Sequence, residues 1–213
     1  MNNRIIWLVV ILSVFAIGFS SCAKDTEVVD PYANWKERNE QFLDSIADVA
    51  SNPPSGEIWR KYANYKIKFD EQINNPIKPY EYKVYDYVYV KYASEEDVLD
   101  LKEGEEPIIN YSDTVSVAYQ GFLINGTRFD GNYYGTFDKD VNDNFTSFGV
   151  SQVVVGWTTA LMNMKPEMND IATLYIPYQM GYGETGSGST IKGYSTLIFE
   201  LYIDKVIHPD ADQ

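Results

Sequence analysis

Histidine and cysteine, the side chains behind most acid–base and thiol chemistry, are almost absent from this chain. Its 213 residues include one histidine, His208, and one cysteine, Cys22. This inventory argues against a disulfide scaffold, a Cys/His zinc site, a Cys-His dyad and a Ser-His-Asp triad. Basic residues are also few, because 17 Lys and Arg stand against 31 Asp and Glu; the net charge of −14 repels phosphate backbones and argues against nucleic acid as a partner. Tyrosine occurs 18 times, which indicates a protein that works through aromatic surface.

Residues 1–21 have the pattern of a secretory signal peptide. Arg4 precedes a largely apolar run from Ile5 to Phe19, which is shorter than the roughly 20 residues that cross a bilayer as a helix. Ser20 and Ser21 stand directly before Cys22, an arrangement that resembles the lipobox of bacterial lipoproteins. The alternative is an uncleaved anchor with an incidental cysteine.

The lipobox resemblance implies that Cys22 is acylated and becomes the mature N-terminus. Residues 22–30 would then form a tether to the membrane. We expect a lipid-anchored protein in the cell envelope of a Gram-negative-type bacterium, at the outer membrane and facing the periplasm or the cell surface.

Residues 31–80 are predicted to form a helical extension. Asp30 followed by Pro31 is typical of a helix start, and the first helix should end at Asn52-Pro53-Pro54. Between them, apolar residues recur at helical spacing: Trp35, Phe42, Leu43, Ile46 and Val49. This stripe either packs on its own domain or makes the protein a homodimer. A second, weaker helix is predicted from Ile58 to Phe69.

From Tyr82 onward the sequence predicts mainly strands. Tyr85, Tyr87 and Tyr89 alternate with other residues and give a strand one aromatic face, which either packs in the sheet or stays open for a partner. Asn125-Gly126 predicts a hairpin turn. Further strands are predicted over Asp113–Tyr119, Ala172–Ile176 and Thr196–Val206, with one short helix over Thr158–Met164. The pattern is that of an α+β fold, an antiparallel sheet wrapped on a short helix.

No metal site or cofactor is predicted. Asp138, Asp140 and Asn142 have the spacing that opens a calcium loop, but Asp143 stands where that loop needs glycine. A solvated acidic loop is the better interpretation.

Four segments, in order along the chain, resemble the FKBP-type peptidyl-prolyl isomerases. They are Val115–Leu123 with Gly126–Asp130, Val153–Trp157, Leu174–Gly183 and Thr196–Leu201. The second is similar to the V-I-P-G-W of the family and the fourth to its closing A-T-L-I-F-E-V strand. The resemblance implies an FKBP-like domain over residues 81–208, followed by a C-terminal tail over residues 209–213.

The resemblance also implies roles for individual residues. The catalytic set carried over from the family is Tyr119, Phe129, Asp130, Trp157 and Tyr182. The substrate-binding set is Val153, Val154, Ile191 and Phe199. In this set Ile191 is expected at the tip of a loop over the site, and the backbone N–H of Val154 is expected to reach the substrate carbonyl.

Isomerisation of an Xaa-Pro bond suits a chain with few titrating side chains. The rotation breaks no covalent bond, and its barrier of ~18–20 kcal/mol comes from amide resonance. A catalyst needs only to bind the twisted amide better than the planar one. The sequence therefore predicts a prolyl isomerase that acts on exported polypeptides containing Xaa-Pro; the alternative is a non-catalytic, FKBP-like binding or chaperone module.

Three departures from the family pattern affect the rim of the site. Thr146 stands where the family has an aromatic residue, with Phe145 and Phe148 displaced to either side. No arginine follows Arg128, so the arginine that steadies the aspartate in the family is missing. Ile191-Lys192-Gly193 replaces the family's I-P-P. We expect these changes to alter substrate preference before they abolish activity.

Overall fold

The computed structural model describes residues 30–74, 78–102 and 104–209. The chain divides into residues 1–33 and residues 34–213, and every helix and strand described below lies in the second unit. The predicted signal peptide, Cys22 and nearly all of the predicted tether lie outside the described residues. None of the described helices combines the length and apolar character needed to cross a membrane.

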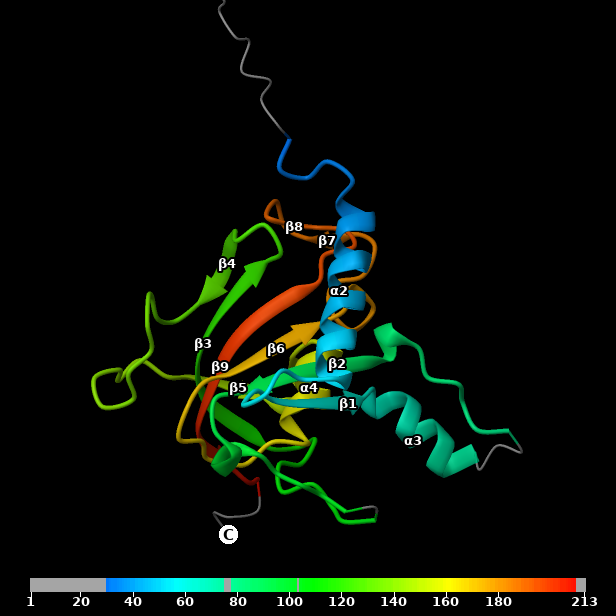
Figure 1. Cartoon of the computed structure of the whole chain (residues 1–213). Helices are drawn as coiled ribbons and strands as arrows, with labels where there is room; N and C mark the ends of the chain where they lie inside the picture. The colour runs from blue at the N-terminus through cyan, green and yellow to red at the C-terminus, as the bar shows by residue number, and fades with distance from the viewer. Residues whose placement is uncertain (1–29, 75–77, 103, 210–213) are drawn as a thin grey trace, which may run out of the picture. The chain divides into compact units, whose positions relative to one another are not determined.

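A seven-stranded antiparallel sheet forms the centre of the second unit (Figure 1). Its order is β1-β2-β6-β9-β3-β4, and β5 pairs with the other half of β3. The strands are β1 Ile58–Ala63, β2 Tyr87–Tyr92, β3 Thr114–Leu123, β4 Arg128–Gly131, β5 Thr146–Gly149, β6 Ala172–Ile176 and β9 Leu197–Ile207. A separate hairpin pairs β7 Gly186–Ser187 with β8 Ile191–Lys192.

Within the described residues, three helices and four 3₁₀ turns complete the fold. The helices are α2 Trp35–Ser51, α3 Tyr65–Asn74 and α4 Val155–Leu161; the turns are η1 Val84–Asp86, η2 Glu95–Asp97, η3 Val150–Gln152 and η4 Tyr178–Met180. Helix α4 packs against β1, β2 and β6. The predicted α+β fold, with an antiparallel sheet and a short helix against it, is confirmed.

The longest strands, β3 and β9, pair along their whole length at the middle of the sheet. Nearly all of β3 is buried, while β9 alternates between buried and partly exposed residues in its first half. The Asn125-Gly126 hairpin turn is confirmed: Leu123 N donates to Thr127 O at 2.9 Å, and Gly126 has a φ of 81°, which favours glycine.

The predicted second helix, Ile58 to Phe69, is wrong in its first half. Residues 58–63 form β1, which pairs antiparallel with β2 so that Ile58 faces Tyr92 across the ladder. Trp59 is 7% exposed because it packs under α2, and this long-range burial outweighs a weak local helical signal. Helix α3 begins only at Tyr65. The extension over residues 31–80 is therefore not purely helical; its boundary with residue 81 stays a prediction.

Helix α2 begins later than Asp30-Pro31 predicts but ends where predicted. Residues 31–34 form a turn, in which Tyr32 N donates to the Asp30 side chain at 2.9 Å. The left-handed backbone of Asn34, with φ at 50°, separates this turn from the helix. Helix α2 buries one residue per turn, at Trp35, Asn39, Leu43 and Ala47. This face packs on its own domain, which was the first of the two alternatives predicted for the apolar stripe.

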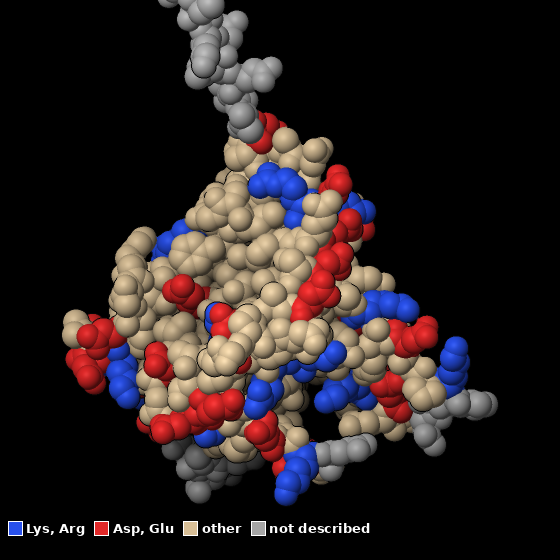
Figure 2. Space-filling view, viewed as in Figure 1, with Lys and Arg blue, Asp and Glu red and all other residues tan. Residues whose placement is uncertain are grey.

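The opposite face of α2 is acidic. Figure 2 shows a row of Asp and Glu side chains along the helix. The buried face meets the sheet, where Leu43 and Ala47 contact Trp59 and Tyr89 in one apolar cluster. Tyr87 and Tyr89 of β2 therefore lie under α2, whereas Tyr85, predicted on the same strand face, lies in η1 and is 42% exposed. Homodimerisation through this helix stays a prediction.

Candidate functional site

A cavity of about 370 Å³ lies between β3, β9 and the start of α4. It is lined by Tyr119, Asp130, Phe148, Gln152, Val153, Val154, Trp157, Tyr182 and Phe199. Seven of the nine predicted site residues are among them. The structure thus brings together side chains from four separate parts of the sequence.

Trp157 is the centre of the aromatic lining and is only 3% exposed. Its ring meets three others nearly edge to face: Tyr119 at 5.4 Å, Phe148 at 5.7 Å and Phe199 at 5.2 Å between centroids. Such perpendicular arrangements are the preferred geometry of aromatic pairs. Three aromatic rings thus surround the Trp157 indole and hold it in one orientation.

Gly156 explains how Trp157 comes so close to the sheet. A Cβ at this position would lie 2.3 Å from Ile176 Cγ2, so only glycine lets the first turn of α4 approach β6 this closely. The indole nitrogen of Trp157 is buried and has no hydrogen-bond partner among the described residues.

The polar side of the cavity holds two phenols and one carboxylate. Burial raises the pKa of Tyr119, and the charge of Asp130 and a hydrogen bond to it raise that pKa further. Burial also raises the pKa of Tyr182, with Asp130 as the second cause. Because tyrosine ordinarily titrates near pH 10, both hydroxyls stay protonated at neutral pH and can donate hydrogen bonds.

Two predicted site residues lie outside the cavity lining. Phe129 stands edge to face against Phe199, at 5.3 Å and 88°, and so supports a wall from behind. Ile191 was expected at the tip of a loop over the site, but it lies in β8 and is 8% exposed. The reason is that the β7-β8 hairpin closes tightly: a Cβ on Gly193 would lie 1.8 Å from Glu184 O, and the hairpin turns the Ile191 side chain inward.

Phe148 supplies the ring that the sequence left in doubt. It contacts both Tyr119, at 5.5 Å, and Trp157, while Phe145 packs near Tyr202. Thr146 points elsewhere, since its Oγ1 accepts a hydrogen bond from Asn132 Nδ2 at 3.0 Å. The spacing alone could not settle the register of β5.

Asn132 is a positioning residue that the sequence did not reveal. Its Oδ1 accepts from Tyr119 N at 2.9 Å, and its Nδ2 donates to Val117 O at 2.9 Å as well as to Thr146. Asn132 thereby joins β3 to β5 in the gap between β4 and β5. An asparagine directly after the Phe129-Asp130-Gly131 run was the available signal.

Asp130 has no arginine beside it. Among the residues that the structure describes, no Lys or Arg lies within 4.0 Å of its carboxylate as an ion pair. Arg128 instead donates from Nη2 to Tyr133 O at 3.0 Å and lies 4.0 Å from the Tyr134 ring centroid. Within the described ranges, no cluster of three or more His, Cys, Asp or Glu could hold a metal ion.

Comparison with known proteins gives consistent matches over this region. Residues 105–204 match the family described as FKBP-type peptidyl-prolyl cis-trans isomerase. The chain is 37% identical over 109 residues to "Peptidyl-prolyl cis-trans isomerase Mip" of Coxiella burnetii, covering 51% of this chain but 43% of that protein. It therefore spans less than half the length of this relative.

A shorter relative is matched almost completely. The chain is 37% identical over 107 residues to "FK506-binding protein" of Neisseria meningitidis serogroup A, covering 50% of this chain and 92% of that protein. A crystal structure of a peptidyl-prolyl cis-trans isomerase from Pseudomonas syringae shares the fold, with a TM-score of 0.52 and 20% identity over 84% of this chain and 98% of that one. The ordered motifs, the aromatic cavity and the near-complete match to a relative lead to one conclusion: the chain belongs to the FKBP-type peptidyl-prolyl cis-trans isomerase family.

Proposed function

We propose that this protein catalyses cis/trans isomerisation of Xaa-Pro bonds in exported polypeptides. The observation that carries the proposal is the cavity in which Trp157 forms a rigid aromatic floor beside two protonated phenols and Asp130. Its volume of about 370 Å³ fits a proline ring with its flanking peptide groups.

The reaction needs an environment that favours the twisted amide. In the planar amide, resonance places partial charge on oxygen and nitrogen, and the twisted amide is less polar. An apolar wall of Trp157, Phe199 and Val153 solvates the twisted form better relative to the planar form than water does. Each tenfold acceleration requires about 1.4 kcal/mol of such differential binding.

Polar groups at the rim orient the peptide. We assign the Tyr182 hydroxyl, which stays protonated, to a substrate carbonyl, and the backbone N–H of Val154 to a second carbonyl. Asp130 faces the reacting amide from the side opposite Val154. No proton is transferred in this scheme, which agrees with a site that holds neither histidine nor cysteine.

The N-terminal segment supports a place in the cell envelope. We propose that Cys22 is lipidated and holds the protein on a membrane of a Gram-negative-type bacterium, where exported chains fold. Labelling of cells with an alkyne fatty acid should mark the wild-type protein and not a Cys22→Ala variant. Labelling of both proteins would contradict this assignment.

A direct assay tests the enzymatic proposal. The purified full-length chain should accelerate cis/trans exchange of an Xaa-Pro peptide, measured by NMR exchange spectroscopy, and Trp157→Ala should remove most of the acceleration. Equal exchange rates in wild-type protein, variant and buffer would overturn the proposal.

A non-catalytic binding module is the second candidate. Two observations favour it: Ile191 is absent from the cavity lining, and Asp130 has no arginine partner. This candidate predicts that the chain suppresses aggregation of an unfolded protein while leaving the exchange rate of the peptide unchanged. Full exchange activity in the assay above would exclude it.

A further inference from the structure

Helix α2 lies outside the segment that matches the family, yet it contacts the segment that carries Tyr182. The family match covers residues 105–204, whereas α2 spans Trp35–Ser51. Figure 1 shows α2 running beside the β7-β8 hairpin. The segment from Gly181 to Thr196, here called the rim segment, contains this hairpin and Tyr182.

Two buried hydrogen bonds join α2 to the end of the rim segment. Trp35 Nε1 donates to Ser195 Oγ at 2.9 Å, and Thr196 N donates to Asn39 Oδ1 at 2.7 Å. Asn39 is fully buried, and Ser195 and Thr196 are at most 2% exposed. Asn39 Nδ2 also donates to Trp35 O at 2.7 Å, which fixes the orientation of the amide.

These bonds cannot be replaced by water without cost. A buried backbone N–H that loses its acceptor keeps its full desolvation penalty. The Asn39 side chain is therefore the acceptor that satisfies the buried N–H of Thr196. Replacing Asn39 with alanine would leave this N–H without its acceptor.

The contact continues from Thr196 towards Tyr182. Tyr194 has a left-handed backbone with φ at 64°, and its N–H donates to Gly183 O at 3.0 Å. Lys36 of α2 lies 4.7 Å from the centroid of the Tyr194 ring. Gly183 directly follows Tyr182, so the residues held by α2 also hold the backbone next to the site phenol.

Strain at Tyr194 makes this support necessary. A bulky residue with positive φ costs free energy and persists only when its surroundings hold it in place. Besides the contact with Lys36, the Tyr194 hydroxyl donates to Glu184 Oε2 at 3.0 Å and its ring meets that of Tyr178 at 5.1 Å. The rim segment is thus held by its contacts with α2 and by the contacts of Tyr194 with Glu184 and Tyr178.

We propose that Asn39 and Trp35 of α2 are positioning residues for Tyr182, so that the N-terminal helix is part of the machinery of the site. The effect that we expect on kcat/KM rests on the proposed isomerase function. The effect that we expect on the mobility of the rim segment does not. Without these two side chains, the rim segment should open more often and Tyr182 should spend less time over the cavity.

A double-mutant cycle in the full-length protein tests the proposal. Loss of one hydrogen bond to substrate in Tyr182→Phe should lower kcat/KM about fivefold, and Asn39→Ala should lower it by a similar factor. If Asn39 acts through Tyr182, the double variant should also be only about fivefold slower, instead of about 25-fold. Multiplied losses would overturn the proposal.

A matched variant on the same helix separates positioning from general stability. Leu43 lies one turn beyond Asn39 and packs in the Trp59 cluster, and the hydrogen bonds to Ser195 and Thr196 come from Trp35 and Asn39 instead. Leu43→Ala should lower the melting temperature at least as much as Asn39→Ala while kcat/KM stays unchanged. An equal loss of activity in both variants would show that only helix stability matters.

Amide hydrogen exchange supplies a readout that needs no catalysis. In Asn39→Ala, and more weakly in the milder Trp35→Phe, amides of residues 183–194 should exchange several-fold faster, and in Leu43→Ala they should not. If the wild-type protein has no isomerase activity, this result still decides whether α2 holds the rim segment. Unchanged exchange in both Asn39→Ala and Trp35→Phe would refute the inference.

Discussion

Two aromatic clusters in this protein use similar residues for different ends. The site cluster consists of Tyr119, Phe148, Trp157 and Phe199 and borders an open cavity. The sheet cluster consists of Trp59, Tyr87, Tyr89 and Tyr175 and is covered by α2. Both clusters include residues of the same antiparallel sheet, and α4 adds Trp157 to the site cluster.

The two indoles show the difference most clearly. Trp59 Nε1 donates to Glu57 Oε2 at 2.8 Å, and its ring stacks on Tyr175 at 5.6 Å. Trp157 Nε1 is buried and has no partner among the described residues. Of the two indoles, Trp157 is the one that lines the cavity.

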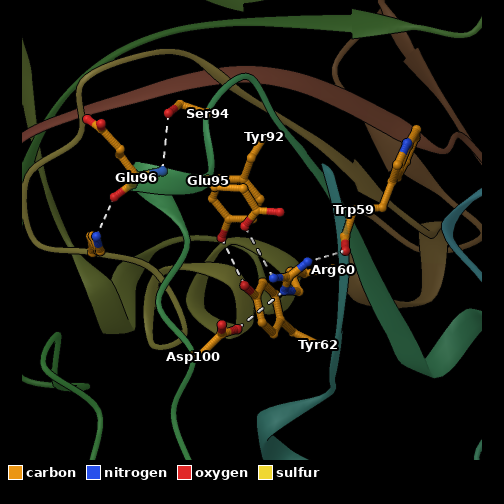
Figure 3. A network of polar contacts seen from close by, with 9 residues as sticks. Trp59, Arg60, Tyr62, Tyr92, Ser94, Glu95, Glu96 and Asp100 are labelled. Carbon is orange, nitrogen blue, oxygen red and sulfur yellow. Dashed lines mark hydrogen bonds and ion pairs between the residues drawn. The ribbon is translucent and has the colours of Figure 1, made fainter. Parts of the chain in front are cut away.

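Tyrosine hydroxyls have different partners in the two regions, and that of Tyr119 in the site is hydrogen-bonded to Asp130. At the N-terminal side of the sheet they are paired within the protein: Tyr89 OH donates to Val84 O at 2.8 Å, and the hydroxyls of Tyr62 and Tyr92 lie 2.9 Å apart (Figure 3). Nearby, Arg60 lies between Glu95 and Asp100, at 3.5 and 3.4 Å. The abundance of tyrosine thus serves packing in one region and a cavity in the other.

The largest expected contrast comes from removing each indole. Trp157→Ala should lower kcat/KM about 100-fold, equivalent to about 2.7 kcal/mol of transition-state binding, because it removes the floor of the cavity. Trp59→Ala should leave kcat/KM within about twofold but lower the free energy of unfolding by about 3–5 kcal/mol. Kinetics and urea denaturation of both variants measure this contrast, and a Trp59→Ala enzyme as impaired as Trp157→Ala would erase it.

A smaller effect is expected from crowding the cavity wall. In Gly121→Ala the new Cβ would lie 2.7 Å from the Phe129 ring and 2.8 Å from Phe199, so the rings must shift. We expect about a tenfold loss of kcat/KM, since overpacking at such distances costs about 1–3 kcal/mol. Adding Phe129→Leu, which makes room, should restore part of the activity; an unaffected single variant would show that the wall tolerates movement.

Breaking a hydroxyl pair in the other region should affect stability alone. Tyr92→Phe leaves the Tyr62 hydroxyl, which is partly buried, without its partner. The free energy of unfolding should fall by about 1–2 kcal/mol while isomerase activity stays unchanged. Thermal denaturation measures the loss of stability, and the peptide exchange assay measures activity. A loss of activity would show that the sheet cluster and the site cluster are coupled.

The smallest effect is expected from pH. The pKa values of Tyr119 and Tyr182 lie above the ordinary value near 10, so kcat/KM should be flat from pH 7 to pH 9 and fall only above about pH 10. Buried tyrosines of the sheet, such as Tyr89, also have raised pKa values, and their contribution to stability is complete below pH 10 and lost as pH rises through the folded-state values. A rate that changes steeply between pH 7 and pH 9 would point to a titrating group in the site.

Local pattern carried the prediction of the C-terminal part of the chain. The strand over Ala172–Ile176 and the Asn125-Gly126 turn are found where predicted, because alternation and turn chemistry are local properties. The helix predicted over Thr158–Met164 is found as α4 but begins earlier, at Val155. Motif order also brought Tyr119, Trp157 and Phe199 together as one candidate site.

Contacts between distant residues decided the remainder. Residues 58–63 became a strand because β2 offered a pairing edge and α2 a cover for Trp59, and neither partner is visible in the local sequence. The position of Phe148 depended on how many residues the loop after β4 absorbs, which spacing does not reveal. Asn132 contacts the site only through its hydrogen bonds to β3, which precedes it, and β5, which follows it.

The sequence by itself determined the family, the antiparallel sheet and most of the cavity lining, since these follow from periodicity and from ordered motifs. Only the tertiary structure decided which aromatic side chains line the cavity, that Ile191 is buried outside that lining, and that α2 contacts the segment carrying Tyr182. The physical reason is that burial and hydrogen-bond satisfaction are properties of the packed molecule, and two tryptophans with equal local sequence character acquire different roles from what surrounds them.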